Sequence, residues 1–183
     1  MENRLQHIRR IFLTGMMGSG KSTVGARLAK ALGYPFLDLD AEVEKTAATS
    51  VARLFREQGE EAFRSLEDAV LRQAAGRQPV VIALGGGTLL NPRNLETVLG
   101  AGILVYLEMD LKELFDRLSD EDRESRPLIE RGEEGEWSQF ERRFEQRLEG
   151  YGSAHIRVDV SGKNPAVICQ MVMDRLKLLD SEL

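Results

Sequence analysis

The sequence predicts a single α/β domain in which helices cover both faces of a mostly parallel β-sheet, a three-layer sandwich. Two observations support this prediction. First, five strand-length apolar segments alternate with segments whose apolar residues recur at helical spacing, which is typical of parallel strands joined by helices. Second, 183 residues suffice for one well-buried α/β domain and are few for two. Ligands of such sheets are expected at the carboxyl ends of the strands.

The first strand, loop and helix are the most informative part of the chain. Residues 8–14 (IRRIFLT) predict a buried strand, and residues 22–32 predict a helix that Gly33 ends. Between them, residues 15–23 read GMMGSGKST, in which two glycines with four residues between them are followed by Lys-Ser. This is the phosphate-loop pattern, and it requires the strand and helix that flank it here. A glycine-rich turn is the alternative, which the flanking elements disfavour.

The loop pattern predicts contacts with the phosphates of a nucleotide. Glycines at 15, 18 and 20 allow the backbone amides to turn toward a polyphosphate, because glycine tolerates positive φ and has no side chain in the way. Lys21 would supply a cation to the outer phosphates. Ser22 would offer its hydroxyl to the magnesium ion that accompanies ATP, and the following helix directs its positive dipole end at the phosphates.

The remaining strands and helices follow in alternation. Strands are expected at residues 35–39, 79–84, 102–107 and 155–160, and helices at residues 41–45, 51–58, 60–75, 92–99, 110–118, 137–151 and 165–179. Residues 79–84 (PVVIAL) are apolar on both faces, which indicates a central strand. Gly59 separates two of the helices, and residues 137–151 carry a largely aromatic stripe at helical spacing.

Several helix starts carry capping signals. Ser50 is expected to cap the helix that follows it, and Asn91 and Asn164 each precede a proline at the first helical position. Asp110 and Glu113 have the spacing of a capping box, in which two side chains cap the helix start reciprocally.

The composition excludes several classes of protein. With 42% hydrophobic and 30% charged residues, it is typical of a soluble globular protein, and the net charge of −5 argues against a nucleic-acid surface. The N-terminus lacks the apolar core of a signal peptide and the apolar runs are only strand-length, so we expect a cytoplasmic protein without membrane contact. Residues 119–136 contain eight acids and three arginines, which is typical of a solvated loop.

Two acids after the second strand are candidates for the chemistry. The central strand ends in glycines, whereas Asp38 and Asp40 follow the second strand at the edge where ligands are expected. We expect Asp38 to face the magnesium ion with Ser22 through a bound water, because Mg²⁺ keeps much of its hydration. Asp40 would face the acceptor of the phosphoryl group. A helix N-cap is an equal alternative for Asp40, and the two roles are compatible.

Residues 85–87 are three consecutive glycines at the end of the central strand. Glycines at a strand end leave room for a ligand to approach the backbone closely. A tight turn from the strand into a helix is the alternative.

Two arginines are candidates for binding an anion. Arg64 lies off the apolar stripe of its helix, and by itself it favours a surface ion pair. Three acids lie at pairing distance from it: Glu60, Glu67 and Asp68. Arg147 flanks the aromatic stripe, where a solvated arginine gains little. Contact with a ligand and a buried ion pair are equal alternatives for it.

Taken together, five motifs resemble the shikimate kinase family: GMMGSGKST, FLDLD, FREQGEEAFRSLE, LGGGT and Arg126-Pro127 followed by Leu128. The resemblance covers nearly the whole chain in order. The family transfers the γ-phosphate of ATP to the 3-hydroxyl of shikimate, a step toward chorismate and the aromatic amino acids. The resemblance implies one P-loop kinase domain over residues 1–183, a five-stranded parallel sheet in the order 2-3-1-4-5, a helical substrate-binding region at about 40–75 and a lid at about 119–136.

The resemblance also implies a role for each residue of these motifs. ATP would be contacted by Gly18, Ser19, Gly20, Lys21, Ser22 and Thr23, with Arg117 and Lys163 near the adenine. Shikimate would be bound by Asp40, Arg64, Gly86, Gly87 and Arg147, of which the two arginines hold its carboxylate. The magnesium ion would be held by Ser22 and Asp38. Catalysis would depend on Asp40, Lys21 and Arg126, the last reaching the phosphates when the lid closes.

Our first hypothesis is therefore an ATP- and Mg²⁺-dependent shikimate kinase that acts as a monomer. A kinase for another small acceptor, such as gluconate or a nucleoside monophosphate, is a second hypothesis, and the acid pair and LGGGT argue against it. A non-catalytic shikimate sensor is a third, which the joint presence of Lys21, Ser22, Asp38 and Asp40 disfavours.

Overall fold

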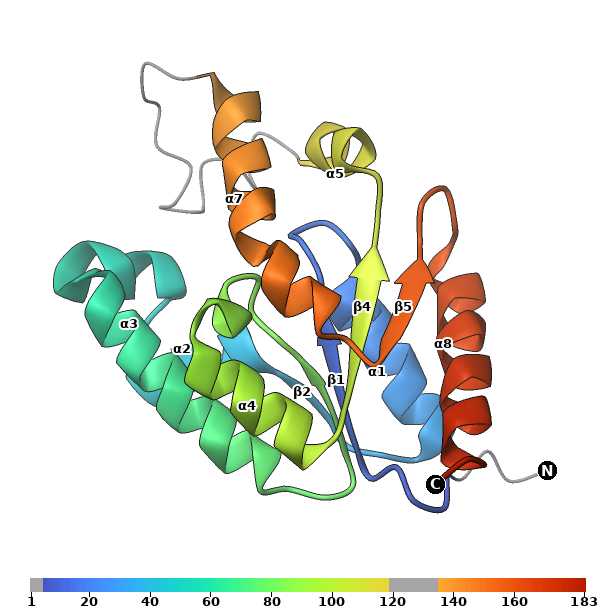
Figure 1. Cartoon of the computed structure of the whole chain (residues 1–183). Helices are drawn as coiled ribbons and strands as arrows, with labels where there is room; N and C mark the ends of the chain where they lie inside the picture. The colour runs from blue at the N-terminus through green and yellow to red at the C-terminus, as the bar shows by residue number, and fades with distance from the viewer. Residues whose placement is uncertain (1–4, 119–134) are drawn as a thin grey trace.

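The computed structural model describes residues 5–118 and 135–183. In this part of the chain five strands form one sheet: β1 (Arg10–Thr14), β2 (Phe36–Asp38), β3 (Val80–Ala83), β4 (Ile103–Glu108) and β5 (Ile156–Asp159). Their order is β2-β3-β1-β4-β5, and all neighbouring strands are parallel (Figure 1). The predicted sheet and its order are confirmed.

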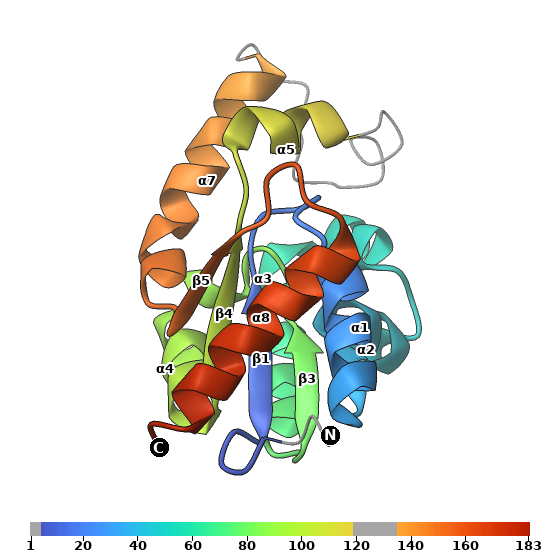
Figure 2. The ribbon, with the colours of Figure 1, turned by 90° about the vertical axis from the view of Figure 1, so that its right-hand side faces the viewer.

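Helices cover both faces of this sheet. In chain order they are α1 (Lys21–Leu32), α2 (Leu39–Ala47), α3 (Val51–Ala75), the short 3₁₀ helix η1 (Thr88–Leu90), α4 (Pro92–Ala101), α5 (Leu111–Arg117), α7 (Glu136–Gly152) and α8 (Pro165–Asp180). Figure 2 shows α1 and α8 in front of one face, and α3 and α4 lie on the other face (Figure 1). The result is the predicted three-layer sandwich.

The central strand β1 is buried on both faces, which explains its continuous apolar sequence. Ile11 and Leu13 join the core beneath α1 and α8, whereas Phe12 joins the core beneath α3 and α4. Successive side chains of a strand point to opposite faces, so a strand between two helix layers needs apolar residues at every position. Hydrophobic burial on both sides therefore holds the loop that follows β1 at the middle of the sheet edge.

Three of the predicted helix caps are confirmed. The side chains of Ser50, Asn91 and Asn164 accept hydrogen bonds from backbone amides in the first turns of α3, α4 and α8. The predicted capping box at α5 is wrong in one half. Asp110 accepts from the amide of Glu113, but the Glu113 carboxylate accepts from the amide of Gly162, on the loop after β5.

The predicted break at Gly59 is a kink within one long element. Gly59 has φ 83° and ψ 173°, so α3 consists of two helices that meet at an angle. The first segment stands beside the carboxyl end of the sheet, while the second packs along its face (Figure 1).

Asp180, at the end of α8, ties the two ends of the chain together. Its carboxylate accepts hydrogen bonds from the amides of Gln6, His7 and Ile8, at 2.6, 2.8 and 2.8 Å. Burial raises the pKa of Asp180, but these hydrogen bonds outweigh it, so the pKa lies below its usual range. The C-terminal end of α8 therefore lies beside residues 6–8, at the amino ends of the strands (Figure 1).

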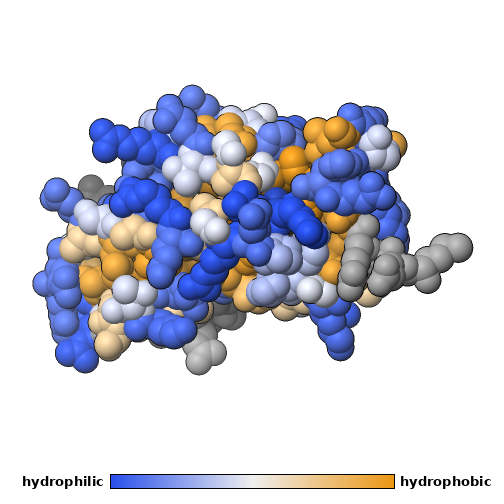
Figure 3. Space-filling view, turned by 90° about the horizontal axis from the view of Figure 1, so that it is seen from below, coloured by the Kyte–Doolittle hydropathy of each residue, from blue (hydrophilic) through white to orange (hydrophobic). Residues whose placement is uncertain are grey.

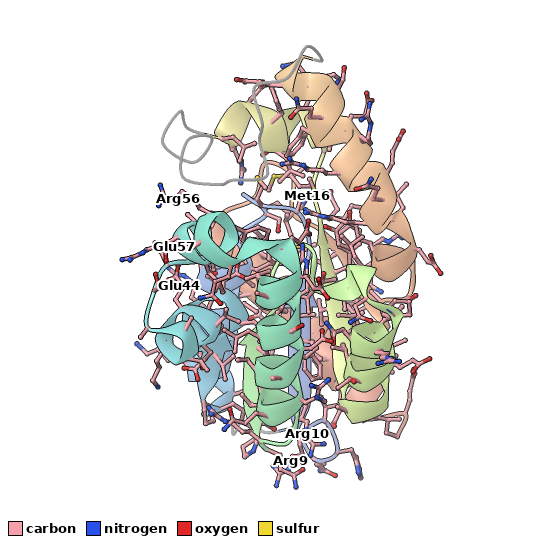
Figure 4. All side chains as sticks on the ribbon, turned by 90° about the vertical axis from the view of Figure 1, so that its left-hand side faces the viewer. Arg9, Arg10, Met16, Glu44, Arg56 and Glu57 are labelled. Atoms are coloured by element: carbon pink, nitrogen blue, oxygen red, sulfur yellow. The ribbon has the colours of Figure 1, made fainter. Side chains whose placement is uncertain are left out.

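The face at the amino ends of the strands carries mainly hydrophilic side chains, with smaller apolar areas between them (Figure 3). Arg9 and Arg10 lie at this end (Figure 4). Across the described residues, each helix is too short or too polar to span a bilayer.

At the opposite end, α5 and the start of α7 stand above the carboxyl edge of the sheet (Figure 1). The two helices touch through aromatic rings: Phe115 meets Trp137 edge-on with ring centroids 5.2 Å apart, and Phe140 at 5.5 Å. These helices flank residues 119–134. Most of the predicted lid, including Arg126, lies outside the described residues.

Candidate active site

A hollow with a volume of about 860 Å³ lies at the carboxyl ends of β1, β2 and β3. Its wall includes the phosphate loop, the start of α2, the kinked part of α3 and the three glycines after β3. Asp40, Arg64 and Arg147 all line it. The residues that sequence motifs single out at positions far apart in the chain therefore converge on one place, at the edge of the sheet where ligands are expected.

The phosphate loop is formed as its sequence requires. Gly18 and Gly20 have φ of 82° and 87°, values that residues with a side chain rarely adopt. Lys21 folds back across the loop, where its Nζ donates to the carbonyl oxygens of Gly15 at 2.9 Å and Met16 at 3.0 Å. The ammonium group is thus held over the loop, beside the start of α1, where the phosphates of a nucleotide would lie.

Two residues of the loop contribute to the site in different ways. Thr23 lines the hollow. Ser19 is buried, and a β-carbon at position 15 would lie 2.7 Å from its Oγ, so its side chain points into the protein. Only the backbone of Ser19 can therefore take part in binding phosphates.

Ser22 and Asp38 meet at the mouth of the hollow. The Ser22 hydroxyl donates to Oδ2 of Asp38 at 2.5 Å, while Oδ1 of Asp38 accepts from the amide of Ala41. A hydroxyl and a carboxylate beside the phosphate loop are hard oxygen ligands of the kind that Mg²⁺ prefers.

The same contacts correct the alternative for Asp40. The N-cap of α2 is Asp38, because α2 begins at Leu39 directly after β2. Asp40 lies in the first turn of α2, one residue after the helix starts, and it lines the hollow.

Each glycine of the triplet lies against one functional side chain. A β-carbon at position 85 would lie 2.7 Å from Oδ1 of Asp40, at 86 it would lie 3.0 Å from Nη1 of Arg147, and at 87 it would lie 2.8 Å from Nη2 of Arg64. The triplet also turns into η1, through a hydrogen bond from the amide of Thr88 to the carbonyl of Gly85. The tight turn is therefore confirmed, and the triplet also allows side chains of the hollow to approach its backbone closely; the approach of a ligand stays a prediction.

Arg64 forms the ion pairs that its helix offers and lines the hollow as well. It pairs with Glu60 at 3.1 Å and with Glu67 at 2.8 Å, whereas Asp68 instead accepts from Asn91 and Asn94. Burial lowers the pKa of Arg64, but the two glutamates outweigh it and raise the pKa above its ordinary value. The guanidinium is therefore fixed in place and permanently charged.

Glu67 is a site residue that sequence reasoning missed as such. It is 1% exposed, and its carboxylate accepts hydrogen bonds from Nη1 of Arg64 at 2.8 Å and Oγ1 of Thr88 at 2.6 Å. It links the helix that carries Arg64 to the turn that follows the glycines. Its spacing from Arg64 signalled a pair, but only the fold shows that the pair is anchored in the interior.

Arg147 is buried, and within the described part of the chain it donates few hydrogen bonds. It is 7% exposed, its Nη1 donates to Sδ of Met16 at 3.2 Å, and its Nε has no hydrogen-bond partner among the described residues. Within residues 5–118 and 135–183 no carboxylate pairs with it, so the alternative of a buried ion pair is not observed there. A buried guanidinium of this kind fits a carboxylate or phosphate ligand.

The position of Arg147 is set by the last turns of α7. Tyr151, one turn later, stacks on Tyr106 of β4 with ring centroids 4.5 Å apart. Gly150 lies against η1, where a β-carbon would come 2.9 Å from Cβ of Leu89. These contacts hold α7 against both the sheet and the glycine turn.

Arg117 and Lys163 lie outside the hollow. Arg117 pairs with Glu113 at 2.5 Å, and Lys163 pairs with Asp159 at 2.9 Å. The Lys163 contact lowers the pKa of Asp159 to about 2. Because Glu113 also accepts from the amide of Gly162, both predicted adenine contacts belong to one region, the end of α5 and the loop after β5.

These features define the class of the protein. A phosphate loop, a carboxylate beyond the second strand and two guanidinium groups in one hollow form the site of a P-loop kinase for a small molecule.

Comparison with known proteins gives the particular family. A family model described as shikimate kinase matches residues 17–177. A shikimate kinase of Persephonella marina is 35% identical over 93% of this chain and 100% of its own length. One of Chlorobium phaeobacteroides is 40% identical over 87% of this chain and 82% of its own length. The chain belongs to the shikimate kinase family, whose members transfer a phosphate from ATP to shikimate.

Solved structures agree with this assignment. A shikimate kinase from Acinetobacter baumannii in complex with shikimate superimposes with a TM-score of 0.88, at 29% identity and with 98% and 97% of the two chains covered. One from Aquifex aeolicus has a TM-score of 0.78 at 34% identity, covering 94% and 96%. A gluconokinase from Sinorhizobium meliloti has a TM-score of 0.61 at 22% identity, which shows a shared fold alone.

Proposed function

We propose that this chain transfers the γ-phosphate of ATP to the 3-hydroxyl of shikimate, and that Asp40, Arg64 and Arg147 bind the acceptor. The observation that carries the proposal is the convergence of these three side chains on one hollow beside the phosphate loop. A small acceptor with one carboxylate and several hydroxyls matches two arginines opposite an aspartate.

The two arginines would bind the carboxylate of shikimate from different elements. Arg64 extends from α3 and Arg147 from α7, and Gly86 and Gly87 lie against their guanidinium groups. Because positions 86 and 87 carry no side chains, the two guanidinium groups can lie directly against the backbone there, and the same backbone would lie against the ring hydroxyls. This arrangement would set the 3-hydroxyl toward Asp40.

Asp40 would orient the 3-hydroxyl for in-line attack on the γ-phosphorus. The new bond forms between the hydroxyl oxygen and phosphorus, the bond to the β-phosphate oxygen breaks, and the hydroxyl proton passes to Asp40. Because the transition state of phosphoryl transfer is loose, the proton can leave late and a strong base is not needed. Alignment and neutralisation of charge would supply most of the rate acceleration.

Lys21 would neutralise charge on the transferring group. Its ammonium already lies over the loop, hydrogen-bonded to two carbonyl oxygens that phosphate oxygens would replace as partners. Arg126 would add a second cation from the lid, and closure would exclude water that otherwise hydrolyses ATP. Gly18, Ser19, Gly20 and Thr23 would contribute loop contacts to the phosphates.

Ser22 and Asp38 would hold Mg²⁺, since their oxygens already meet at the loop. When bound, the ion would supply positive charge that stabilises the phosphates during transfer. Arg117 and Lys163 would lie near the adenine. We further propose a monomer in the cytoplasm, where ATP is supplied.

The test is ADP release by the purified protein with shikimate, gluconate or AMP as the acceptor. We expect turnover with shikimate, and only background ATP hydrolysis with gluconate and AMP. Turnover with gluconate or AMP instead would support the second hypothesis, and tight shikimate binding without ADP release would support the sensor.

A further inference from the structure

We propose that Met16 is a positioning residue for the acceptor: its thioether holds Arg147 in place, and its backbone links that arginine to the phosphate loop. The inference rests on the proposed function. Met16 lies within the loop, where a phosphate-loop pattern specifies no residue type. Figure 4 shows it above the ribbon of α3, below α5 and beside α7.

The first step is the contact between Met16 and Arg147. Nη1 of Arg147 donates to Sδ of Met16 at 3.2 Å, and Met16 is 1% exposed. The two residues are 131 positions apart in the sequence, and the contact joins the phosphate loop to α7. Among the described residues no carboxylate pairs with this guanidinium, and Sδ of Met16 accepts a hydrogen bond from it. The phenol of Tyr151 lies beside it as well: burial raises the pKa of that phenol, and the nearby Arg147 counteracts the rise.

The thioether of Met16 differs from the usual hydrogen-bond acceptors of an arginine. A thioether is neutral, polarisable and a weak hydrogen-bond acceptor. It can orient one N–H of a buried guanidinium without neutralising its charge, which leaves the charge and the remaining donors to an anionic ligand. A carboxylate at this position would compete with the substrate, and an aliphatic side chain would leave the donor without a partner.

The third step is the other contacts of Met16. Its carbonyl oxygen accepts hydrogen bonds from Nζ of Lys21 at 3.0 Å and from the amide of Ser19 at 3.2 Å. One residue therefore touches both the lysine expected at the phosphates and the arginine expected at the carboxylate of the acceptor. The side chain of Met16 is consequently set by the same loop geometry that receives the nucleotide.

The experiment compares Met16→Leu with Met173→Leu, a buried methionine on α8 far from the hollow. Shikimate affinity is measured by calorimetry without nucleotide, and KM and kcat by ADP release. Loss of one weak hydrogen bond to a charged group predicts that Met16→Leu weakens shikimate binding by roughly threefold to tenfold, mainly in KM. Met173→Leu should bind shikimate like the wild type.

Two further measurements separate positioning from packing. Met16→Gln restores an acceptor at similar length, so it should bind shikimate more tightly than Met16→Leu does, and it serves as the folded variant if the leucine variant unfolds. The methyl ester of shikimate lacks the anionic carboxylate, so the wild type and Met16→Leu should bind it equally.

The outcomes distinguish this inference from the proposed function. If the wild-type protein does not phosphorylate shikimate, the proposed function fails. If the wild type is active and Met16→Leu binds shikimate with wild-type affinity, the positioning role is wrong. The role is also wrong if Met16→Gln binds shikimate as weakly as Met16→Leu does. It is wrong too if Met16→Leu loses as much affinity for the methyl ester as it loses for shikimate.

Discussion

Gly87 lies so close to Arg64 that a β-carbon at position 87 would come within 2.8 Å of the guanidinium Nη2. Arg64 has little freedom to move away, because its Nη1 donates a hydrogen bond to the buried carboxylate of Glu67. The absence of a side chain at 87 is therefore a requirement of the position that Arg64 occupies, and not of the backbone, because φ at Gly87 is −110°.

Gly87→Ala should displace Arg64 and lower kcat/KM for shikimate by roughly tenfold to a hundredfold, because small misplacements at a reacting site are costly. Steady-state ADP release measures this. Gly100→Ala is the matched control, since a β-carbon at that helical position meets no atom within 4 Å. Equal kinetics for the two variants would refute the argument from close approach.

Asp40→Asn should reduce kcat by roughly 10²- to 10⁴-fold, because the amide can neither accept the hydroxyl proton nor orient the hydroxyl as well. ATP affinity should stay close to that of the wild type, since Asp40 is expected to face the acceptor. Calorimetry measures the ATP affinity, and ADP release measures kcat. Asp174→Asn on the exposed side of α8 is the control, and unchanged turnover in Asp40→Asn would remove Asp40 from the mechanism.

The two arginines should differ in their effect on stability. Replacing either by methionine should strongly raise KM for shikimate. Arg64→Met also leaves the buried carboxylate of Glu67 without its cation, which should cost about 2 kcal/mol in the free energy of unfolding. Arg147→Met removes a buried charge that no described carboxylate balances, so its unfolding midpoint in urea should equal or exceed the wild-type value. The reverse order of stabilities would contradict the description of both arginines.

Glu67 and Glu60 pair with the same arginine and therefore form a natural comparison. Glu67 is 1% exposed and Glu60 is 57% exposed. An exposed ion pair contributes about 0–1 kcal/mol, whereas a buried one is costly to break. Glu67→Gln should thus raise KM for shikimate several-fold more than Glu60→Gln, with less effect on kcat than on KM. Equal KM values for the two variants would show that burial of Glu67 does not position Arg64.

Asp180 should make stability depend on pH. In the folded protein its pKa lies below the ordinary value of 3.8. Its contribution to the free energy of unfolding is therefore complete above pH 3.8 and is lost as the pH falls through the lowered pKa. Urea unfolding at pH 7 should show Asp180→Asn to be less stable by about 1–3 kcal/mol, since a charged acceptor for one buried and two partly buried amides is lost. The difference from wild type should shrink at pH 3. Asp174→Asn is again the control, and a constant difference between the two pH values would exclude Asp180 as its source.

Local signals explain the parts of the structure that the sequence predicts well. The phosphate loop, the alternation of strands and helices and the caps at Ser50, Asn91 and Asn164 each depend on residues within one turn or one strand. The sheet order came from the family resemblance, because strand pairing joins segments far apart in the chain.

The features that sequence reasoning missed depend on contacts between distant segments. Glu67 becomes an interior residue only because Thr88 lies over it, and Met16 meets Arg147 across 131 positions. The sequence offers Asp40 as an alternative N-cap of α2, because it predicts a strand that extends to Leu39 and a helix that begins at Ala41. The helix instead starts directly at the strand end, so the cap moves to Asp38.

The edge-on contact between Phe115 and Trp137 has a practical consequence. Trp137 is the single tryptophan of the chain, so the intrinsic emission of the protein excited at the red edge of its absorption has one source. That source lies where α5 meets α7, at the root of the segment expected to close over the nucleotide. Titration with ATP, followed by the wavelength and quenching of this one fluorophore, reports on that junction directly and without any label.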